Sequence, residues 1–222
     1  MNEKTAINID ELLQRFVSTD DLRPRFMKPW RERDKVFASE NHILIRVNGN
    51  MTTANYPEYN SDNTNKLIPT GASDGILSAA ILENAISYAP LVDEKERVID
   101  DVECKECDGT GEVEWDYKCW SKMFECPCCY GTGHIETSRK KATDRKVIDP
   151  NAVIKIGPKY FWAGFLKQIL DAMEYCGCKE ATVTFGDRIR ATRFNLTDEI
   201  DIILMPTSSN AAYKTISLKK VC

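Results

Sequence analysis

The feature that most constrains this chain is a pair of matching cysteine repeats near its middle. The segments CKECDGTG (104–111) and CPCCYGTG (126–133) follow one pattern, in which two cysteines three positions apart precede a Gly-x-Gly. Glycine permits the left-handed backbone of a tight turn, so each repeat predicts a rigid loop whose amides point at sulfur. Two such loops brought together offer four thiolates in a tetrahedron, the geometry that zinc prefers in structural sites.

The spacing C-x2-C-x18-C-x2-C lies in the range of zinc ribbons. We therefore predict that one zinc ion is bound by Cys104, Cys107, Cys126 and Cys129. Cys129 is preferred to its neighbour Cys128 because only Cys129 keeps the distance to its Gly-x-Gly that Cys107 has. Cys119 and His134 are the alternative ligands. Four thiolates leave no open position for water, so the site is expected to be structural; two redox-active CxxC pairs are the alternative chemistry.

The two repeats resemble the cysteine-rich CxxCxGxG zinc-finger repeats of DnaJ-type co-chaperones. The resemblance covers about 104–133 and implies a zinc-binding module that can bind polypeptides. Members of that family usually carry four repeats and two zinc ions, whereas this chain has two repeats and no HPD-bearing J-domain. The same repeats occur in proteins unrelated to chaperones, so a co-chaperone function does not follow.

The ends and composition of the chain favour a cytoplasmic protein. The N-terminal MNEKTAINIDELLQRF has no apolar core of a signal peptide, and no apolar run is long enough to span a membrane. In a reducing compartment, nine cysteines favour metal binding over disulfides. The net charge of −4 argues against a dedicated nucleic-acid-binding protein but leaves room for a local basic patch.

Outside the repeats, hydrophobic spacing predicts an α+β domain of helices and antiparallel strands. Helices are expected at 9–17, 73–89 and 158–175, with Pro158 opening the last. Strands are expected at 25–30, in a hairpin at 35–47, and at 153–156, 181–185, 189–196, 200–205 and within 212–222. A long loop is predicted at 48–72 and a basic linker at 137–149. We expect a discontinuous domain formed by 1–100 and 137–222, with 101–136 as an inserted zinc module.

Two segments of this domain resemble the bacterial DNA sliding clamp, a processivity factor. Residues 159–208 are similar to its final helix-and-strands half, which ends in a strand and a Met-Pro pair, here Met205-Pro206. Residues 35–47 are similar to its strand, turn and next strand. The resemblance implies a clamp-like fold with a DNA-replication partner. A clamp chain has two or three such domains, whereas 222 residues allow one, so clamp function itself is not expected.

The densest basic run follows the cysteine repeats. It consists of Arg139, Lys140, Lys141, Arg145 and Lys146. Lysine and arginine contact phosphates, so this run is the candidate nucleic-acid-binding site, and a solvated linker is the alternative. The aromatic residues Trp115, Trp120, Phe124 and Tyr130 are expected either to stack on bases or dock a partner, or to form the small core of the module.

The sequence favours a non-enzymatic function. It holds two histidines and no arrangement of nucleophile, base and orienting acid, and it has no phosphate-binding loop. We therefore expect a zinc-binding accessory protein that interacts with nucleic acid or with a DNA-replication or processing partner. The alternatives are a protein-interaction adaptor, or chaperone-like peptide binder, acting through the zinc module, and a thiol oxidoreductase.

Overall fold

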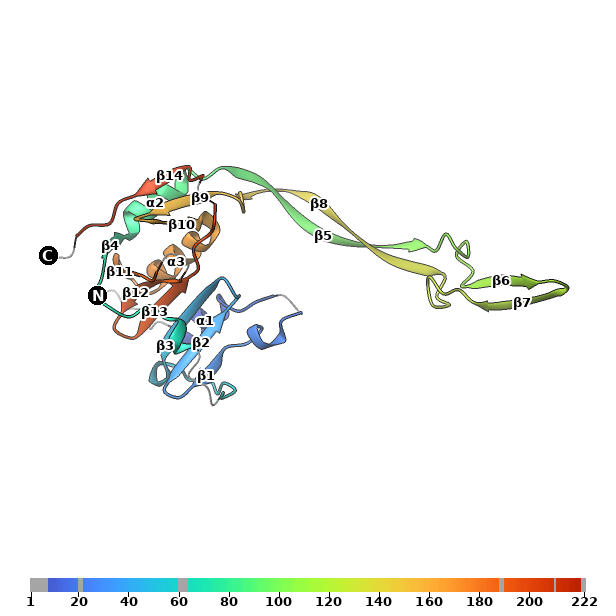
Figure 1. The fold of residues 1–222 in the computed structure, drawn as a ribbon, viewed down its shortest axis with the longest axis horizontal. Coiled ribbons are helices and arrows are strands. Elements are labelled where there is room, and N and C mark those ends of the chain that lie inside the picture. Colours follow the sequence, from blue (N-terminus) through green and yellow to red (C-terminus); the bar gives the residue numbers. More distant parts are fainter. Residues whose placement is uncertain (1–7, 20–21, 60–63, 188–189, 210, 221–222) are drawn as a thin grey trace, which may run out of the picture. The chain divides into compact units, whose positions relative to one another are not determined.

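The computed structural model describes residues 8–19, 22–59, 64–187, 190–209 and 211–220. The chain divides into two compact units, one formed by residues 1–90 with 148–222 and the other by Leu91–Val147 (Figure 1). The first unit has an extended apolar core, whereas the buried cluster of the second unit consists of four cysteines. Within the described ranges, no helix is long and apolar enough to cross a membrane.

The first unit is built on a seven-stranded antiparallel sheet. Its strand order is β1 (Trp30–Glu32), β2 (Lys35–Ser39), β3 (Ile43–Asn48), β13 (Ile200–Leu204), β12 (Thr192–Thr197), β11 (Glu180–Phe185) and β4 (Gly75–Ser78). Strands from both ends of the sequence meet where β3 pairs with β13. All five residues of β13 are buried, as expected for the middle strand of a covered sheet.

A second sheet has the order β10 (Lys159–Trp162), β9 (Val153–Ile156) and β14 (Lys214–Ile216). The β9–β10 hairpin turns through Gly157 and Pro158, and Gly157 has a φ of +55°. A two-residue hairpin with glycine first needs this left-handed backbone. Strand β14 runs parallel to β9 and supplies the edge strand expected in the tail.

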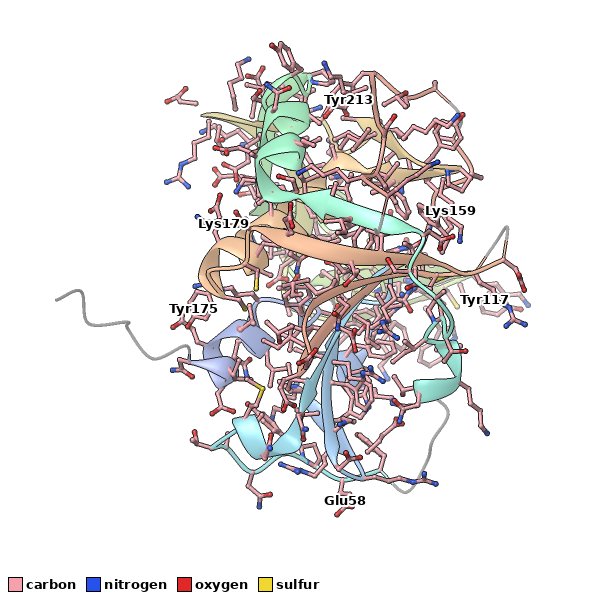
Figure 2. All side chains as sticks on the ribbon, turned by 90° about the vertical axis from the view of Figure 1, so that its left-hand side faces the viewer. Glu58, Tyr117, Lys159, Tyr175, Lys179 and Tyr213 are labelled. Atoms are coloured by element: carbon pink, nitrogen blue, oxygen red, sulfur yellow. The ribbon has the colours of Figure 1, made fainter. Side chains whose placement is uncertain are left out.

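Among the residues that the structure describes, three α-helices complete the first unit: α1 (Ile9–Gln14), α2 (Ala79–Ser87) and α3 (Ala163–Tyr175). Short 3-10 turns lie at η1 (Pro24–Phe26), η2 (Gly49–Met51) and η3 (Asn65–Leu67). Asn8 caps α1 by accepting a hydrogen bond from the Glu11 amide at 3.2 Å. The Tyr175 hydroxyl at the end of α3 donates to the Asn8 carbonyl, 3.1 Å away, beside α1 (Figure 2). The apolar faces of all three helices belong to one core with the sheets.

The second unit consists of two antiparallel ribbons. Strands β5 (Leu91–Glu103) and β8 (His134–Ile148) wind around each other, and β6 (Glu112–Tyr117) pairs with β7 (Trp120–Glu125) (Figure 1). The long ribbon is bounded by backbone hydrogen bonds from Asp149 to Pro90 and from Cys104 to Gly133, both 2.8 Å. Between these bonds β5 has 13 residues and β8 has 15, so β8 accommodates its extra residues in bulges.

Several predicted elements need correction. The helix expected at 73–89 begins only at Ala79, because Gly75–Ser78 pairs with β11 as a strand. The helix expected at 158–175 begins at Ala163, because Gly157-Pro158 forms a hairpin turn that places 159–162 in a strand. The strand expected at 25–30 is absent except at its last residue, because the turn η1 ends at Phe26 and β1 starts at Trp30.

The predicted linker at 137–149 is also wrong, because most of it belongs to the continuous strand β8. The predicted loop at 48–72 contains η2 and η3, and its residues 60–63 lie outside the described residues. The hairpin at 35–47 and the strands at 153–156, 181–185 and 200–205 are present with small shifts of their ends.

Candidate metal centre and its surroundings

The four predicted cysteines come together in one buried cluster. The sulfur atoms of Cys104, Cys107, Cys126 and Cys129 all lie within 4.8 Å of one another. Two sulfur pairs across the repeats are 3.8 Å (Cys104 and Cys126) and 3.7 Å (Cys107 and Cys129) apart. A tetrahedron with zinc–sulfur bonds of about 2.3 Å has edges of about 3.8 Å. A disulfide needs a sulfur–sulfur distance of about 2.05 Å. The arrangement therefore fits a four-coordinate metal ion, and no disulfide links these pairs.

In each repeat, a backbone amide donates a hydrogen bond to the sulfur of the second cysteine. The Gly111 amide donates to the Cys107 sulfur at 3.3 Å, and the Gly133 amide donates to the Cys129 sulfur at 3.2 Å. Thr110 locks its loop by donating its hydroxyl to the Cys107 carbonyl at 2.6 Å, and Thr132 does the same in the second repeat. Amide donors spread the negative charge of a thiolate and orient it, which is the role of a second shell around a metal.

The two repeats are related residue by residue at an offset of 22 positions. The Cys104 amide donates to the Gly133 carbonyl, and the Cys126 amide donates to the Gly111 carbonyl, both at 2.8 Å. The first glycine of each repeat has a φ near +80°, as do the last ones. The loops therefore hold each other through backbone atoms, and each repeat completes the other.

The electrostatics of this cluster suit a bound cation. Burial raises the pKa of the Cys104 thiol, and it raises the pKa of Cys126 to about 11. Burial also opposes ionisation of Cys129, but hydrogen bonds from the Gly133 amide and the neighbouring thiols outweigh it and lower its pKa to about 7. Several buried thiolates repel each other, and a divalent cation at their centre removes that penalty.

The alternative ligands lie outside the cluster. Cys128 and Cys119 are exposed, and Cys119 sits in the turn between β6 and β7. His134 points its Nδ1 toward the Asp101 carboxylate, 3.6 Å away. Val113 and Ile135 pack against the four cysteines and cover them with apolar surface.

The predicted nucleic-acid-binding run lies on β8, opposite an acidic strand. Arg139 pairs with Asp100, and Lys146 pairs with Asp93. The partner strand β5 has six acidic and two basic residues, whereas β8 has five basic and two acidic residues. Adjacent residues of a strand point to opposite faces, so Lys140 and Lys141 diverge. The arrangement spreads these cations and compensates much of their charge.

The β6–β7 hairpin holds a surface that the sequence analysis did not separate. Opposite residues of paired antiparallel strands share a face. One face, which we name the aromatic face, consists of Val113, Trp115, Tyr117, Trp120, Lys122 and Phe124. The opposite, acidic face consists of Glu112, Glu114, Asp116, Ser121, Met123 and Glu125. The aromatic side chains are exposed, so they do not form the internal core that was one of their predicted roles.

The first unit contains a pocket that the sequence did not reveal. Its volume is about 730 Å³, and its walls combine apolar and cationic side chains. Trp30 and Ile68 belong to the small cluster behind it, while Arg25, His42 and Arg190 also line it. These residues come from four separate segments, so no local motif could have identified them.

Comparison with known proteins gives similarity of fold. No protein-family model matches the chain, and no curated protein does. The chain is similar to the DnaN sliding clamp of Bartonella birtlesii bound to griselimycin, with 14% identity and a TM-score of 0.47 over 92% of this chain and 64% of that one. It is also similar to the DNA polymerase sliding clamp of Bacillus subtilis, with 16% identity and a TM-score of 0.44 over 90% of this chain and 63% of that one.

The DNA polymerase III β subunit of Thermotoga maritima gives 11% identity and a TM-score of 0.44, over 90% of this chain and 63% of that one. The chain thus spans less than two thirds of the length of these three structures. The α+β, antiparallel architecture predicted from the sequence is confirmed by the helices and the seven-stranded antiparallel sheet of the first unit. The resemblance of the cysteine repeats to DnaJ-type repeats stays a prediction.

Proposed function

We propose that this chain is a non-enzymatic, zinc-stabilised accessory protein whose second unit presents a binding surface to another macromolecule. The observation that carries the proposal is the buried four-sulfur cluster with edges of 3.7 and 3.8 Å. The donor set consists of thiolates alone, which favours zinc over harder cations such as magnesium or calcium. A closed four-thiolate site has no position for an activated water, which supports a structural role.

The zinc ion is proposed to replace a hydrophobic core in the second unit. The apolar residues packed on the cysteines are only Val113 and Ile135 among the described residues. A unit with so little apolar burial needs another source of stability, and metal binding couples directly to folding in such modules. The metal thereby fixes the base of the β6–β7 hairpin.

Of the two predicted partner classes, the charge distribution favours a protein. Arg139 and Lys146 are paired with carboxylates of β5, so they are less available to phosphates. Residues 101–133, which include both repeats and the hairpin, contain eight acidic and three basic residues. A surface of this sign repels a phosphate backbone. Binding to nucleic acid or to a replication protein stays a prediction, and the salt dependence of binding tests it.

The experiment that tests the metal-stabilised fold is chelation followed by limited proteolysis. Removing zinc is expected to expose residues 104–133 to protease while the first unit, with its own core, stays protected. Re-addition of zinc should restore protection. If the apo-protein is cleaved no faster than the zinc form, the metal does not stabilise the unit and the proposal is wrong.

A second candidate function is peptide binding by the first unit, which the 730 Å³ pocket supports. Apolar walls with a few cationic groups suit a segment that combines apolar and acidic side chains. A Met205→Glu variant places a negative charge at the wall of this pocket. It should weaken binding of a labelled acidic, leucine-containing peptide, while a variant of the second unit such as Trp115→Ala should not. Equal binding by wild type and Met205→Glu would exclude this pocket as the peptide site.

A further inference from the structure

The aromatic face of the hairpin exposes several large aromatic side chains to solvent. The exposed fractions are 63% for Trp115, 71% for Tyr117 and 76% for Trp120. Trp115 and Phe124 are in tilted contact, with ring centroids 5.7 Å apart, and Tyr117 pairs with Trp120 across the strands of the same face. Exposed apolar patches rimmed by polar residues mark interaction sites in soluble proteins.

The metal cluster holds this face in place at its base. Val113, the first residue of the aromatic face, packs against the four cysteines, and its strand partner is Phe124. The hairpin turn contains Lys118 with a φ of +58°, so the two strands are joined by a tight connection. A short hairpin with anchored ends presents its side chains in a fixed order and therefore loses little conformational freedom on binding.

The charge of residues 101–133 indicates which kind of partner the aromatic face would bind. Residues 101–133 carry a net formal charge of −5, from eight acidic and three basic side chains. Four thiolates around one divalent cation add two further negative charges. The acidic residues of the hairpin lie on its other face, and three of them, Glu112, Glu114 and Asp116, belong to β6, the strand that carries Trp115. A cationic partner is attracted to this region, and an anionic one is repelled.

A pocket beside Trp115 is a candidate site for a cation. Its volume is about 430 Å³, and it is lined by Val113, Trp115, Pro127 and Cys107 together with four acidic residues: Glu106, Asp108, Glu112 and Glu114. An arginine side chain satisfies both kinds of wall, because its guanidinium stacks on an indole ring and donates paired hydrogen bonds to carboxylates. Lysine can supply the charge but not the paired geometry.

We infer that the aromatic face binds a partner polypeptide segment in which arginine side chains lie next to apolar ones. The arginine enters the pocket beside Trp115, and the apolar side chains cover Tyr117 and Trp120. This inference rests on the proposed function, because the zinc site holds the base of the hairpin. A second copy of the chain is a poorer occupant, since two acidic regions would face each other. A single nucleic-acid strand would stack on the rings but bring its phosphates toward the carboxylates.

The test uses the full zinc-loaded chain and three fluorescent probes: a peptide alternating arginine and leucine, its counterpart with glutamate for arginine, and an oligothymidylate. Binding is measured by anisotropy at two salt concentrations. The arginine peptide should bind, and more tightly at low salt. Trp115→Ala should weaken it at least about tenfold. The double variant Glu112→Gln, Glu114→Gln should weaken it and flatten its salt dependence.

Tyr88→Ala is the matched control, because Tyr88 is 64% exposed but lies in the first unit. It should leave binding of the arginine peptide unchanged. Equal binding of the glutamate peptide, tighter binding of the oligothymidylate, or a dimer that dissociates in Trp115→Ala would each overturn the inference. Zinc content is measured for every sample. A wild-type chain without zinc contradicts the proposed function, whereas one zinc per chain without binding of the arginine peptide contradicts this inference alone.

Discussion

Gly111 and Gly131 approach each other so closely that neither repeat has room for a side chain at the crossing. A Cβ atom on Gly111 would overlap the carbonyl oxygen of Gly131 and lie 3.0 Å from its carbonyl carbon. Gly133 stands in the same relation to Gly109. Gly111 and Gly133 also have positive φ values, +80° and +76°. Space and backbone conformation thus both demand glycine at Gly111 and Gly133, whereas Gly109 and Gly131 are favoured by their positive φ values alone.

Replacing Gly111 by alanine is therefore expected to separate the two repeats. The steric overlap and the left-handed backbone together should cost about 3 kcal/mol or more and lower zinc affinity correspondingly. A chelator competition assay measures the affinity. Gly164→Ala is the control, because a Cβ there meets open space in α3 and should be neutral or slightly stabilising. Unchanged zinc affinity in Gly111→Ala would contradict the crossing geometry.

Tyr130 offers a prediction of the opposite sign. It has a φ of +52° and is 84% exposed. Its left-handed backbone is therefore strained, and packing of the ring does not offset that strain. Tyr130→Gly should tighten zinc binding by about 1 kcal/mol. Tyr117→Gly is the control in a regular strand and should destabilise the hairpin instead. The same competition assay measures both variants, and weaker zinc binding by Tyr130→Gly would show that the ring has a structural role.

In the first unit, Asp201 links three polar side chains across the main sheet. It accepts hydrogen bonds from Arg46 Nε and Asn195 Nδ2, both 3.0 Å, and Arg193 Nε lies 3.0 Å away. Asp201 is only 4% exposed, so its loss leaves partly buried arginines without a counter-charge. Asp201→Ala should lower the free energy of unfolding by about 3 kcal/mol.

Denaturant titration of Asp201→Ala measures this change. Asp187 provides the matched comparison, because its ion pair with Arg190 lies on the surface with both side chains mostly exposed. Asp187→Ala should change the free energy of unfolding by less than about 1 kcal/mol. Similar losses in the two variants would show that burial of Asp201 is unimportant.

Asp10 predicts an acid-sensitive contact between α1 and the following loop. It accepts hydrogen bonds from the Thr53 amide at 2.9 Å and the Tyr56 hydroxyl at 2.7 Å. Burial opposes ionisation, but hydrogen bonds from Thr53, Tyr56 and Ala54 outweigh it and lower the pKa of Asp10 below its ordinary value of 3.8. A carboxyl group whose pKa is lowered in the folded state stabilises the fold at pH values above its ordinary pKa. This contribution disappears as the pH falls through the lowered, folded-state pKa.

Asp10→Asn should therefore reduce stability at neutral pH by on the order of 1 kcal/mol. The difference from wild type should shrink as the pH falls below 3.8. Thermal melts of both proteins between neutral and strongly acidic pH measure it. A difference that stays constant across this range would show that the charge of Asp10 does not contribute.

The clustering of the four cysteines could be predicted from the sequence because all four belong to short repeats with their own turn chemistry. The main sheet was also foreseeable where strands alternate, as in 35–47 and 181–185. The starts of two helices were misplaced because apolar residues next to a helix also suit a buried strand. In both cases the deciding information is tertiary: Gly75–Ser78 pairs with β11, and 159–162 pairs with β9.

The basic run could not be interpreted from its own residues. Its charge is offset by β5, which lies more than 30 positions earlier in the chain, as the pairs of Arg139 with Asp100 and Lys146 with Asp93 show. The aromatic face was hidden for a related reason. Only the register of β6 against β7 separates Trp115, Tyr117 and Trp120 from the carboxylates that alternate with them in the sequence.

The most direct test of the central claim is elemental analysis of the purified chain and its cysteine variants. We expect one zinc ion per wild-type chain, its loss in Cys129→Ser, and full retention in Cys128→Ser, since the Cys129 sulfur lies in the cluster and Cys128 is exposed. Cys104→Ser should behave as Cys129→Ser does. Full zinc content in Cys129→Ser, or a wild-type chain that binds no zinc, would contradict the account.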